Sequence, residues 1–444
     1  MGDELREVRL GEVARVKHGF AFDGQWFVEE PSRDVLVTPG NFEIGGGFKL
    51  DKLKYYRGPV PDEYVLSEGD LIVTMTDLSK ASDTLGYSAV VPRRDPLRFL
   101  HNQRTGKLEI TRLDLVDKEF LYWLLRTPQY RAEVLASATG TAVKHTAPSR
   151  IEAFRFVPPE LMEQRAIAHI LGTLDDKIEL NRQTNETIEE MARAIFKSWF
   201  VDFDPVHAKA EGRRPRGMDA ETAKLFPSAF EESAIGELPK GWTTAPVYEL
   251  ATYINGAAYR AFEPNEERRG LPIIKIAELK AGVTEQTKFS EVAMPEKYRI
   301  DRGDLLFSWS GNPDASIDTF VWPHDPAWLN QHIFRVVPHR KEERAFVLAT
   351  LRYLKPVFAE IARNKQTTGL GHVTVDDMKR LLVVRPDDNA LRCWNAVAEP
   401  LFGRLFQNEV EGQTLVATRD ALLPRLLSGD LRVHEAEGTI QEAT

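Results

Sequence analysis

The sequence has almost no cysteine: Cys393 is the only one among 444 residues. A single cysteine excludes a disulfide framework and a zinc site built from several thiolates. No run of 18 or more apolar residues occurs, and the opening stretch MGDELREVRLGEV lacks the apolar core of a signal peptide. We therefore expect a cytoplasmic protein without membrane spans.

An excess of positive charge is also missing. The chain has 58 lysine and arginine residues against 67 aspartate and glutamate residues, which gives a formal net charge of −9. This balance argues against a protein that coats nucleic acid non-specifically, but it leaves room for local basic patches on a specific reader. The apolar content of 42% is typical of a globular protein, and the length predicts two or more domains.

Complete catalytic motifs are absent as well. FEIGGGFK (42–49) has no strand–glycine–helix unit around it and is predicted to be a turn. TGTAVKHT (139–146) lacks the second glycine of a phosphate-binding loop. SGNPDAS (310–316) resembles the Asn-Pro-Pro-aromatic motif of adenine methyltransferases, but Asp314 and Ala315 replace the second proline and the aromatic residue.

Metal-ligand spacing is missing among the histidines too, since no H-E-x-x-H pattern occurs. VDDMKR (375–380) matches a metal-nuclease motif poorly, and we interpret it as the charged start of a solvated helix. We expect neither catalytic nor metal-binding residues in this chain.

What the sequence does contain is a repeat at an offset of about half its length. Four pairs of segments match in the same order: LGEVARVKHGFAF (10–22) with VYELATYINGAAYRAF (247–262), YVLSEGDLIVTMT (64–76) with YRIDRGDLLFSWS (298–310), FLHNQRTGKLEI (99–110) with WLNQHIFRVVP (328–338), and TGTAVKHTAPSRIEAFRFVPP (139–159) with TTGLGHVTVDDMKRLLVVRP (367–386). The common order and nearly constant offset indicate a tandem duplication.

Each copy mixes strands and helices, which predicts an α+β fold. DLIVTMT (70–76) and DLLFSWS (304–310) are predicted strands, each entered through a Gly-Asp turn. Residues 118–136 and 343–362 carry apolar side chains at helical spacing and are predicted amphipathic helices.

A long helix with a seven-residue apolar repeat is predicted to end each copy. The repeating positions are Ile167, Leu174, Asn181, Ile188 and Ile195 in the first copy, and Trp394, Leu401, Asn408, Leu415 and Leu422 in the second. Met191 and Ala192 are predicted to fill neighbouring positions of the same face. Such a repeat is typical of a coiled coil, here a rod of roughly 50 Å.

Asn181 and Asn408 interrupt the apolar face at matching places. An asparagine in a coiled-coil interface costs stability but fixes the register when it meets another asparagine. The two residues are therefore predicted register determinants that lie level with each other. The alternative is that each faces solvent on an irregular helix.

Candidate nucleic-acid contacts recur in both copies. Asparagine and glutamine can bind adenine through two hydrogen bonds, and arginine can bind guanine, whereas hydroxyl, backbone and cationic groups suit phosphates. The candidates are Asn102, Gln103, Arg104, Thr139, Gly140, Lys144 and His145 in the first copy, and Asn330, Gln331, His332, Thr368, Gly369 and His372 in the second. Their recurrence indicates either DNA contact or shared architecture, since each residue alone suits a turn equally well.

Three segments carry a resemblance to a known family. EQRAIAHILGTLDDKIELNRQTNETIEEMARAIFKSWFVDFDPVHAKAEG (163–212) resembles the central conserved region of the specificity subunit of type I restriction-modification systems. GMDAETAKLFPSAFEESAIGELPKGW (217–242) resembles the connector that follows it, and ALLPRLLSGDLRV (421–433) is similar to the end of the distal conserved helix. The resemblance extends over nearly the whole chain.

The resemblance implies two duplicated α/β target recognition domains separated by two antiparallel coiled-coil helices. The corresponding expected segments are 1–160 for the first domain, 161–205 for the central helix, 206–242 for the connector, 243–388 for the second domain, 389–432 for the distal helix and 433–444 for a flexible tail.

The resemblance also implies a non-catalytic prokaryotic subunit that binds double-stranded DNA at a bipartite site. Its expected partners are two methyltransferase subunits, which carry S-adenosylmethionine, and restriction subunits, which use ATP and Mg. No cofactor is expected on this chain itself. A duplicated protein–protein scaffold without base readout remains the alternative, and a solitary methyltransferase or nuclease is disfavoured by the missing motifs.

Overall fold

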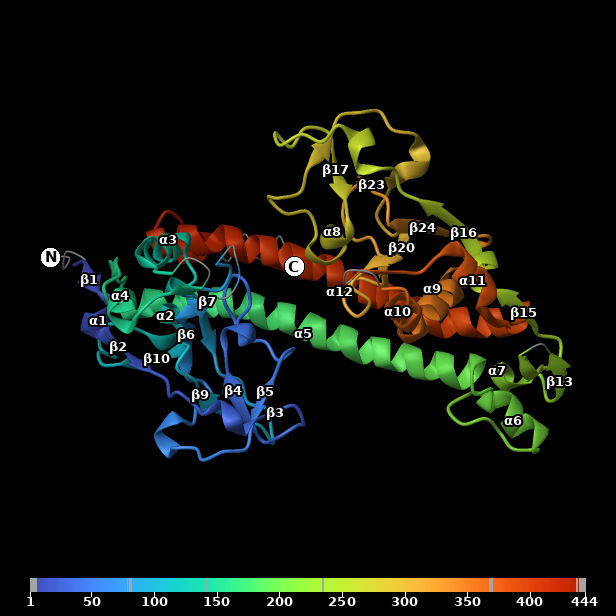
Figure 1. Ribbon diagram of the computed structural model, residues 1–444, viewed down its shortest axis with the longest axis horizontal. Coiled ribbons are helices and arrows are strands. Elements are labelled where there is room, and N and C mark those ends of the chain that lie inside the picture. The colour runs from blue at the N-terminus through green and yellow to red at the C-terminus, as the bar shows by residue number, and fades with distance from the viewer. Residues whose placement is uncertain are drawn as a thin grey trace. The chain divides into compact units, whose positions relative to one another are not determined.

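The computed structural model describes residues 6–77, 79, 82–140, 143–233, 235–366, 370–436 and 438. The chain divides into two compact units, Met1–Ile178 with Thr414–Thr444 (unit 1) and Glu179–Gln413 (unit 2). Each unit contains one copy of the repeat together with part of each of two long helices, α5 (Leu161–Phe200) and α12 (Asp388–Ser428) (Figure 1).

The first domain in unit 1 contains two four-stranded sheets. One sheet is antiparallel, with the order β2 (Ala14–His18), β10 (Thr105–Ile110), β6 (Leu71–Thr74) and β8 (Ser88–Val90). The other has the order β3 (Phe27–Val28), β5 (Lys54–Tyr56), β4 (Asp34–Val37) and β9 (Arg98–His101), with β4 and β9 parallel.

Short elements complete this domain. They are the paired strands β1 (Val8–Arg9) and β12 (Arg155–Phe156), the paired strands β7 (Thr76–Asp77) and β11 (Lys144–His145), and the helices α1 (Leu10–Val13), α2 (Lys118–Leu124), α3 (Pro128–Ser137) and α4 (Pro148–Glu152).

Strand β6 is buried on both faces, which explains why its sequence is a continuous apolar run. Leu71 and Val73 face a core formed with α2, α3, α5 and α12, whereas Ile72 faces a second core that includes Val35 and Phe99 of the other sheet. A strand buried on both faces loses the alternation of apolar and polar residues that a half-exposed strand shows. The sheet therefore lies between the helices and the second sheet (Figure 1).

The second domain in unit 2 repeats this arrangement. Its antiparallel sheet has the order β16 (Ala251–Asn255), β24 (Ile333–Pro338), β20 (Leu305–Ser308) and β22 (Asp318–Val321). Its other sheet has the order β18 (Phe289–Ser290), β17 (Leu271–Ile274), β23 (Ala327–Leu329) and β19 (Arg299–Ile300), again with one parallel pair, β17 and β23. The antiparallel sheets have the same strand order, and the other sheets share the order of three strands, β5-β4-β9 and β18-β17-β23, which confirms the duplication predicted from the sequence.

The remaining elements of unit 2 include those of the segment expected to be a connector. They are α6 (Asp204–Ala210), α7 (Ala220–Lys224), the hairpin β13 (Phe230–Ser233) and β14 (Gly236–Pro239), the pair β15 (Thr243–Pro246) and β26 (Leu382–Arg385), the pair β21 (Ser310–Gly311) and β25 (Gly371–His372), and the helices α8 (Ile276–Ala281), α9 (Arg344–Tyr353), α10 (Lys355–Asn364) and α11 (Val375–Arg380).

The predicted Gly-Asp turns precede β6 and β20 as expected. Gly69 and Gly303 have φ values of 80° and 92°, which favour glycine because a side chain would be strained there. The aspartate that follows each glycine accepts a hydrogen bond from the backbone three residues earlier, and each pairs with a cation on the neighbouring strand: Asp70 with Lys107 at 2.7 Å and Asp304 with Arg335 at 3.0 Å.

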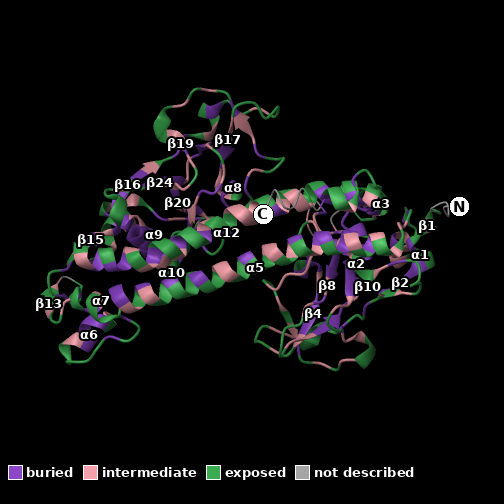
Figure 2. Ribbon diagram, turned by 180° about the vertical axis from the view of Figure 1, so that it is seen from behind, coloured by how far each residue is buried: buried purple, intermediate pink, exposed green. Residues whose placement is uncertain are grey.

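The two long helices pack against each other in opposite directions. In unit 2, Asn181 of α5 contacts Glu411 of α12, and Asn185, one turn later, contacts the carbonyl of Leu405. A forward step on α5 thus corresponds to a backward step on α12, which defines an antiparallel pair. Figure 2 shows buried positions recurring along both helices, as the seven-residue repeat predicts.

One expected member of the apolar face is wrong. Met191 is 49% exposed, whereas Ala192 is buried in the core of unit 2. Adjacent residues of an α-helix are separated by about 100° around its axis, and at this point the rotation of α5 turns Ala192 toward the core and Met191 away from it. Apolar residues on consecutive positions left that choice open in the sequence.

Asn181 and Asn408 are both buried, but they do not pair with each other. Nδ2 of Asn181 donates to Oε2 of Glu411 at 2.8 Å, and Nδ2 of Asn408 donates to Oδ1 of Asn185 at 2.8 Å. The expected contact between Asn181 and Asn408 is therefore corrected to a polar layer of four residues. The repeat places the two asparagines near each other, but the rotation of each helix decides which side chains meet.

Two segments that were expected to lie outside the domains contribute to the cores of the units. The connector is part of the core of unit 2, where Phe226 and Trp242 pack against Trp199 and Phe200 with ring centroids 5.1 and 5.7 Å apart. The expected flexible tail begins too early, because Ala436 is fully buried in the core of unit 1. The rest of that expected tail, apart from residue 438, lies outside the described residues.

Among the described residues, no helix combines the length and the apolar character that crossing a bilayer requires.

The polar layer leads to a first prediction, a double-mutant cycle. Replacing Asn185 and Asn408 by alanine, singly and together, should give a coupling of about 1 kcal/mol because the two amides share a hydrogen bond. The Asn181 and Asn408 pair serves as the control and should couple more weakly. Unfolding free energies from urea denaturation measure both cycles. A stronger coupling for the control pair would indicate that Asn181 and Asn408 contact each other after all.

Candidate nucleic-acid interface

Asn102 closes a turn at one end of the antiparallel sheet of the first domain. Its Oδ1 accepts a hydrogen bond from the backbone of Arg104 at 3.1 Å, and its side chain is only 5% exposed. The segment runs beside Phe20, because the backbone of Gln103 donates to the Phe20 carbonyl at 2.9 Å. Asn102 therefore shapes the turn, and this geometry does not present it to a base.

Asn330 occupies the equivalent place in the second domain. It is 7% exposed, and the backbone of Gln331 donates to the carbonyl of Ala257 at 2.7 Å. In both domains a glycine faces this turn: a Cβ on Gly19 or Gly256 would lie 2.1 Å from the carbonyl oxygen of the asparagine. The shared Gly and Asn residues are thus explained by a close backbone crossing that both copies need.

The residues that follow each asparagine are more accessible. Gln103 and Gln331 are half-buried, Arg104 is exposed, and His332 is half-buried with a positive φ of 78°. An exposed guanidinium can contact a base or a phosphate directly. Arg104 and His332 are the strongest of the predicted base contacts because they occupy the same place in the two turns but differ in chemistry.

The second group of candidates lies on a two-stranded ribbon in each domain. In the first domain, His145 on β11 lies opposite Thr76 on β7, and its Nδ1 is 3.2 Å from the threonine hydroxyl. Lys144 is half-buried, and Thr139 and Gly140 are exposed beside it; the Thr139 backbone pairs with that of His145.

The second domain has the same ribbon. His372 on β25 lies opposite Ser310 on β21, and its Nδ1 is 2.8 Å from the serine hydroxyl. Thr368 and Gly369, which were predicted to contact phosphate beside it, lie outside the described residues.

One residue in each domain joins the turn to the ribbon. In the first domain the backbone of Met75 accepts from Thr146 and donates to the carbonyl of Arg104, each at 2.9 Å. In the second domain the backbone of Trp309 makes the equivalent bonds, with Val373 at 2.9 Å and with His332 at 3.2 Å. Candidates 35 or more residues apart in the sequence are thus brought to one edge of each domain, which we call the polar edge.

The two polar edges differ in their electrostatics. In the second domain the Trp309 ring centroid lies 5.0 Å from that of His332 and 6.0 Å from that of His372. Burial, and then the neighbouring His372, lowers the pKa of His332 below its usual value, so this side chain is neutral at pH 7. The first domain has the permanently charged Arg104 at that place.

His101, next to the turn of the first domain, is not an exposed cation. Burial lowers its pKa to about 4, and its Nε2 donates to the carbonyl of Thr105 at 3.0 Å. It therefore supports the turn as a neutral ring.

Sequence reasoning missed four residues of the polar edges: Met75, Thr76, Trp309 and Ser310. All four lie in the repeated segments DLIVTMT and DLLFSWS. Those segments were interpreted as strands, and the structure places their last two residues beyond β6 and β20. Asn255, whose Oδ1 accepts from the indole Nε1 of Trp309 at 3.1 Å, was also missed, although it lies in the repeated segment 247–262.

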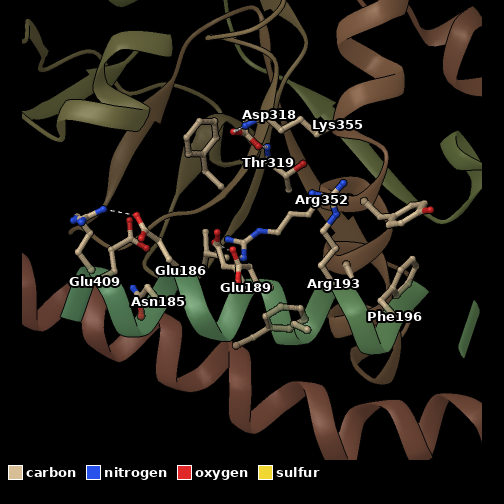
Figure 3. A pocket seen from close by; sticks show the side chains of 18 residues that line it. Asn185, Glu186, Glu189, Arg193, Phe196, Asp318, Thr319, Arg352, Lys355 and Glu409 are labelled. Atoms are coloured by element: carbon tan, nitrogen blue, oxygen red, sulfur yellow. Dashed lines mark hydrogen bonds and ion pairs between the residues drawn. The ribbon is translucent and has the colours of Figure 1, made fainter. Parts of the chain in front are cut away.

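Unit 2 also contains a cavity of about 650 Å³ bordered by α5, α9, α12 and β22 (Figure 3). Charges of both signs line it: Arg352 pairs with Glu189 at 3.1 Å, Lys355 pairs with Asp318, and Glu409 projects from α12. None of the predicted nucleic-acid contacts lines this cavity. Its mixed charge does not suit a phosphate backbone.

The motifs rejected in the sequence have structural explanations. Asn312 of SGNPDAS accepts from the backbones of Asp314 and Ala315, both at 3.0 Å, and so forms a turn. VDDMKR forms α11, which Thr374 caps. Within the part of the chain that is described, no cluster of three or more histidine, cysteine, aspartate or glutamate side chains could hold a metal ion.

Comparison with known proteins gives consistent matches. A family model described as "Type I restriction modification DNA specificity domain" matches residues 3–190 and 239–390. The type I restriction enzyme HindI specificity subunit of Haemophilus influenzae is 26% identical over 79% of this chain and 87% of its own length. The MjaIX specificity subunit of Methanocaldococcus jannaschii is 25% identical over 93% and 98%.

A solved structure shares the fold. The type I restriction-modification system S subunit from M. genitalium has a TM-score of 0.55 and 16% identity, and the match covers 95% of this chain and 96% of that chain.

The burial of Asn102 leads to a second prediction. Asn102→Ala should lower the free energy of unfolding by about 1–2 kcal/mol, because the backbone amide of Arg104 loses the acceptor that the buried Asn102 side chain provides. Arg104→Ala, the control in the same turn, should change it by less than about 0.5 kcal/mol, because its side chain is exposed. Chemical denaturation monitored by tryptophan fluorescence measures both. An unchanged stability of the Asn102 variant would return this residue to the set of direct base contacts.

Proposed function

This chain belongs to the type I restriction modification DNA specificity family, and we propose that each of its two repeated domains reads one half of a split DNA site. Membership of the family makes the chain a DNA specificity subunit and not a catalytic one. The family likewise implies no cofactor on this chain.

The observation that carries the proposal is that one chain builds the same polar edge twice. Each edge joins a turn and a ribbon through a single residue, Met75 or Trp309, and each carries hydrogen-bonding side chains that are exposed or half-buried. A reader of one continuous site would need only one such edge. Two edges with a common frame and different side chains, such as Arg104 and His332, suit two half-sites of different sequence.

The two long helices are shared by both units. Helices α5 and α12 run without interruption for 40 and 41 residues, and both contribute to the cores of both units. We therefore assign the spacing between half-sites to the helices, at about 1.5 Å per residue.

A surface of α5 supports docking of the methyltransferase subunits. Met162, Leu180 and Met191 are 83%, 57% and 49% exposed. At about 100° per residue they share one face of the helix, which also carries His169 and Thr173. An exposed apolar stripe on a helix is suited to packing against a partner. The methyltransferase would bring S-adenosylmethionine, and restriction subunits would bring ATP and Mg.

A domain exchange tests both parts of the proposal and is the third prediction. Residues 1–160 are replaced by the same segment of another family member, and the chain is expressed with its methyltransferase partner. Methylation sequencing should show one half-site replaced and the other kept. The exchanged chain should still co-purify with the methyltransferase, because α5 and α12 are unchanged.

The two results are read separately. A change in both half-sites would contradict the assignment of one reader to each half. Loss of co-purification would indicate that the methyltransferase docks on the first domain and not on the helices. Methylation without any sequence preference would favour the duplicated scaffold over a DNA reader.

A further inference from the structure

The two ribbons place a histidine directly opposite a hydroxyl residue. His145 is paired in register with Thr76, and His372 with Ser310. In both pairs the contact is to Nδ1 of the imidazole, at 3.2 and 2.8 Å. The same atom of the same residue type is thus held at the same place in each domain.

The contact fixes the orientation of each ring. Thr76 and Ser310 are buried, at 5% and 6% exposed, whereas His145 is exposed and His372 is half-buried. When the hydroxyl donates to Nδ1, the ring proton of a neutral imidazole resides on Nε2. Neither Nε2 has a hydrogen-bond partner among the residues that the structure describes.

A catalytic Ser–His pair does not explain this geometry. The Ser310 hydroxyl is buried, so it is poorly placed to attack a substrate, and the equivalent residue in the first domain is a threonine. Nδ1 is already used by the hydroxyl, so no carboxylate orients the ring through that atom as in a hydrolase triad.

We propose that Nε2–H of His145 and Nε2–H of His372 each donate a hydrogen bond to a DNA phosphate, one in each half-site, with Thr76 and Ser310 as the positioning residues. This proposal rests on the proposed function. The Nε2–H donor is present in the protonated ring, and in the neutral ring when the hydroxyl donates to Nδ1.

The duplication distinguishes this role from base reading. Phosphates are the same in every half-site, whereas the bases differ, so a phosphate contact can be identical in both domains. The hydroxyl–histidine pair is conserved between the two copies in chemistry and in register. The turn residues Arg104 and His332 differ at an equivalent place, as residues with different targets would.

Two isosteric replacements separate the proposed role from a structural one. An asparagine amide can take the place of Nδ1, so His145→Asn keeps the contact to Thr76 but loses the outer donor. A glutamine amide can take the place of Nε2, so His145→Gln keeps the outer donor but loses the contact to Thr76. His372→Asn and His372→Gln form the matched pair in the second domain.

The measurement is the fourth prediction: binding of the full chain, assembled with its methyltransferase partner, to a duplex that contains its mapped site. The Asn variants should bind about tenfold more weakly, and the Gln variants should remain within about threefold of the original chain. The loss should be similar for the mapped site and for an unrelated duplex, because a phosphate contact carries no sequence information.

Methylphosphonate substitution identifies the phosphate. One neutral linkage in one half-site should remove the difference between the original chain and His145→Asn, and one in the other half-site should do so for His372→Asn. If the Asn variants bind normally while the Gln variants fail, or if no single linkage removes the difference, the proposal is wrong. A normal split-site specificity of the original chain in the same experiment shows that the proposed function itself still holds.

Discussion

The antiparallel packing of α5 and α12 is the constraint on which the rest of the structure depends. Neither domain completes its core without both helices: unit 1 uses Ile170 and Leu174 of α5 with Leu415 and Leu422 of α12, and unit 2 uses Phe196 with Trp394. Each fully buried large apolar side chain contributes roughly 1.5–3 kcal/mol. The core of the first domain therefore requires residues near the end of the chain, so the two copies of the repeat cannot fold as independent modules at full stability.

A repeated arginine fixes each domain to this helical pair. In unit 1, Arg126 at the end of α2 pairs with Asp175 of α5 at 2.9 Å, and Arg419 of α12 pairs with the same carboxylate. In unit 2, Arg352 of α9 pairs with Glu189 of α5 at 3.1 Å. The side chain of Arg126 is only 4% exposed, so removing its partner would leave a buried charge uncompensated. These contacts attach the helical part of each domain to α5.

The duplication, the two long helices and the approximate position of both polar edges could be predicted from the sequence, because a repeat and a seven-residue periodicity are visible in the order of residues. It did not reveal which asparagines meet, since a rotation of a few tens of degrees exchanges Asn181 for Asn185 as the partner of Asn408. Nor did it separate Asn102, which is buried in a turn, from Arg104, which is exposed, because both are polar residues in one loop. Thr76 and Ser310 were missed because their role arises only when the ribbons pair with histidines far along the chain.

Photocrosslinking from the two turns tests the central claim of two separate readers most directly. Arg104 and His332 are replaced in turn by p-benzoylphenylalanine in the chain assembled with its methyltransferase partner, and the crosslinked nucleotides are mapped on a duplex with the split site. The account predicts crosslinks from position 104 in one half-site only and from position 332 in the other half-site only. Crosslinks from both positions in the same half-site, or outside the site altogether, would contradict it.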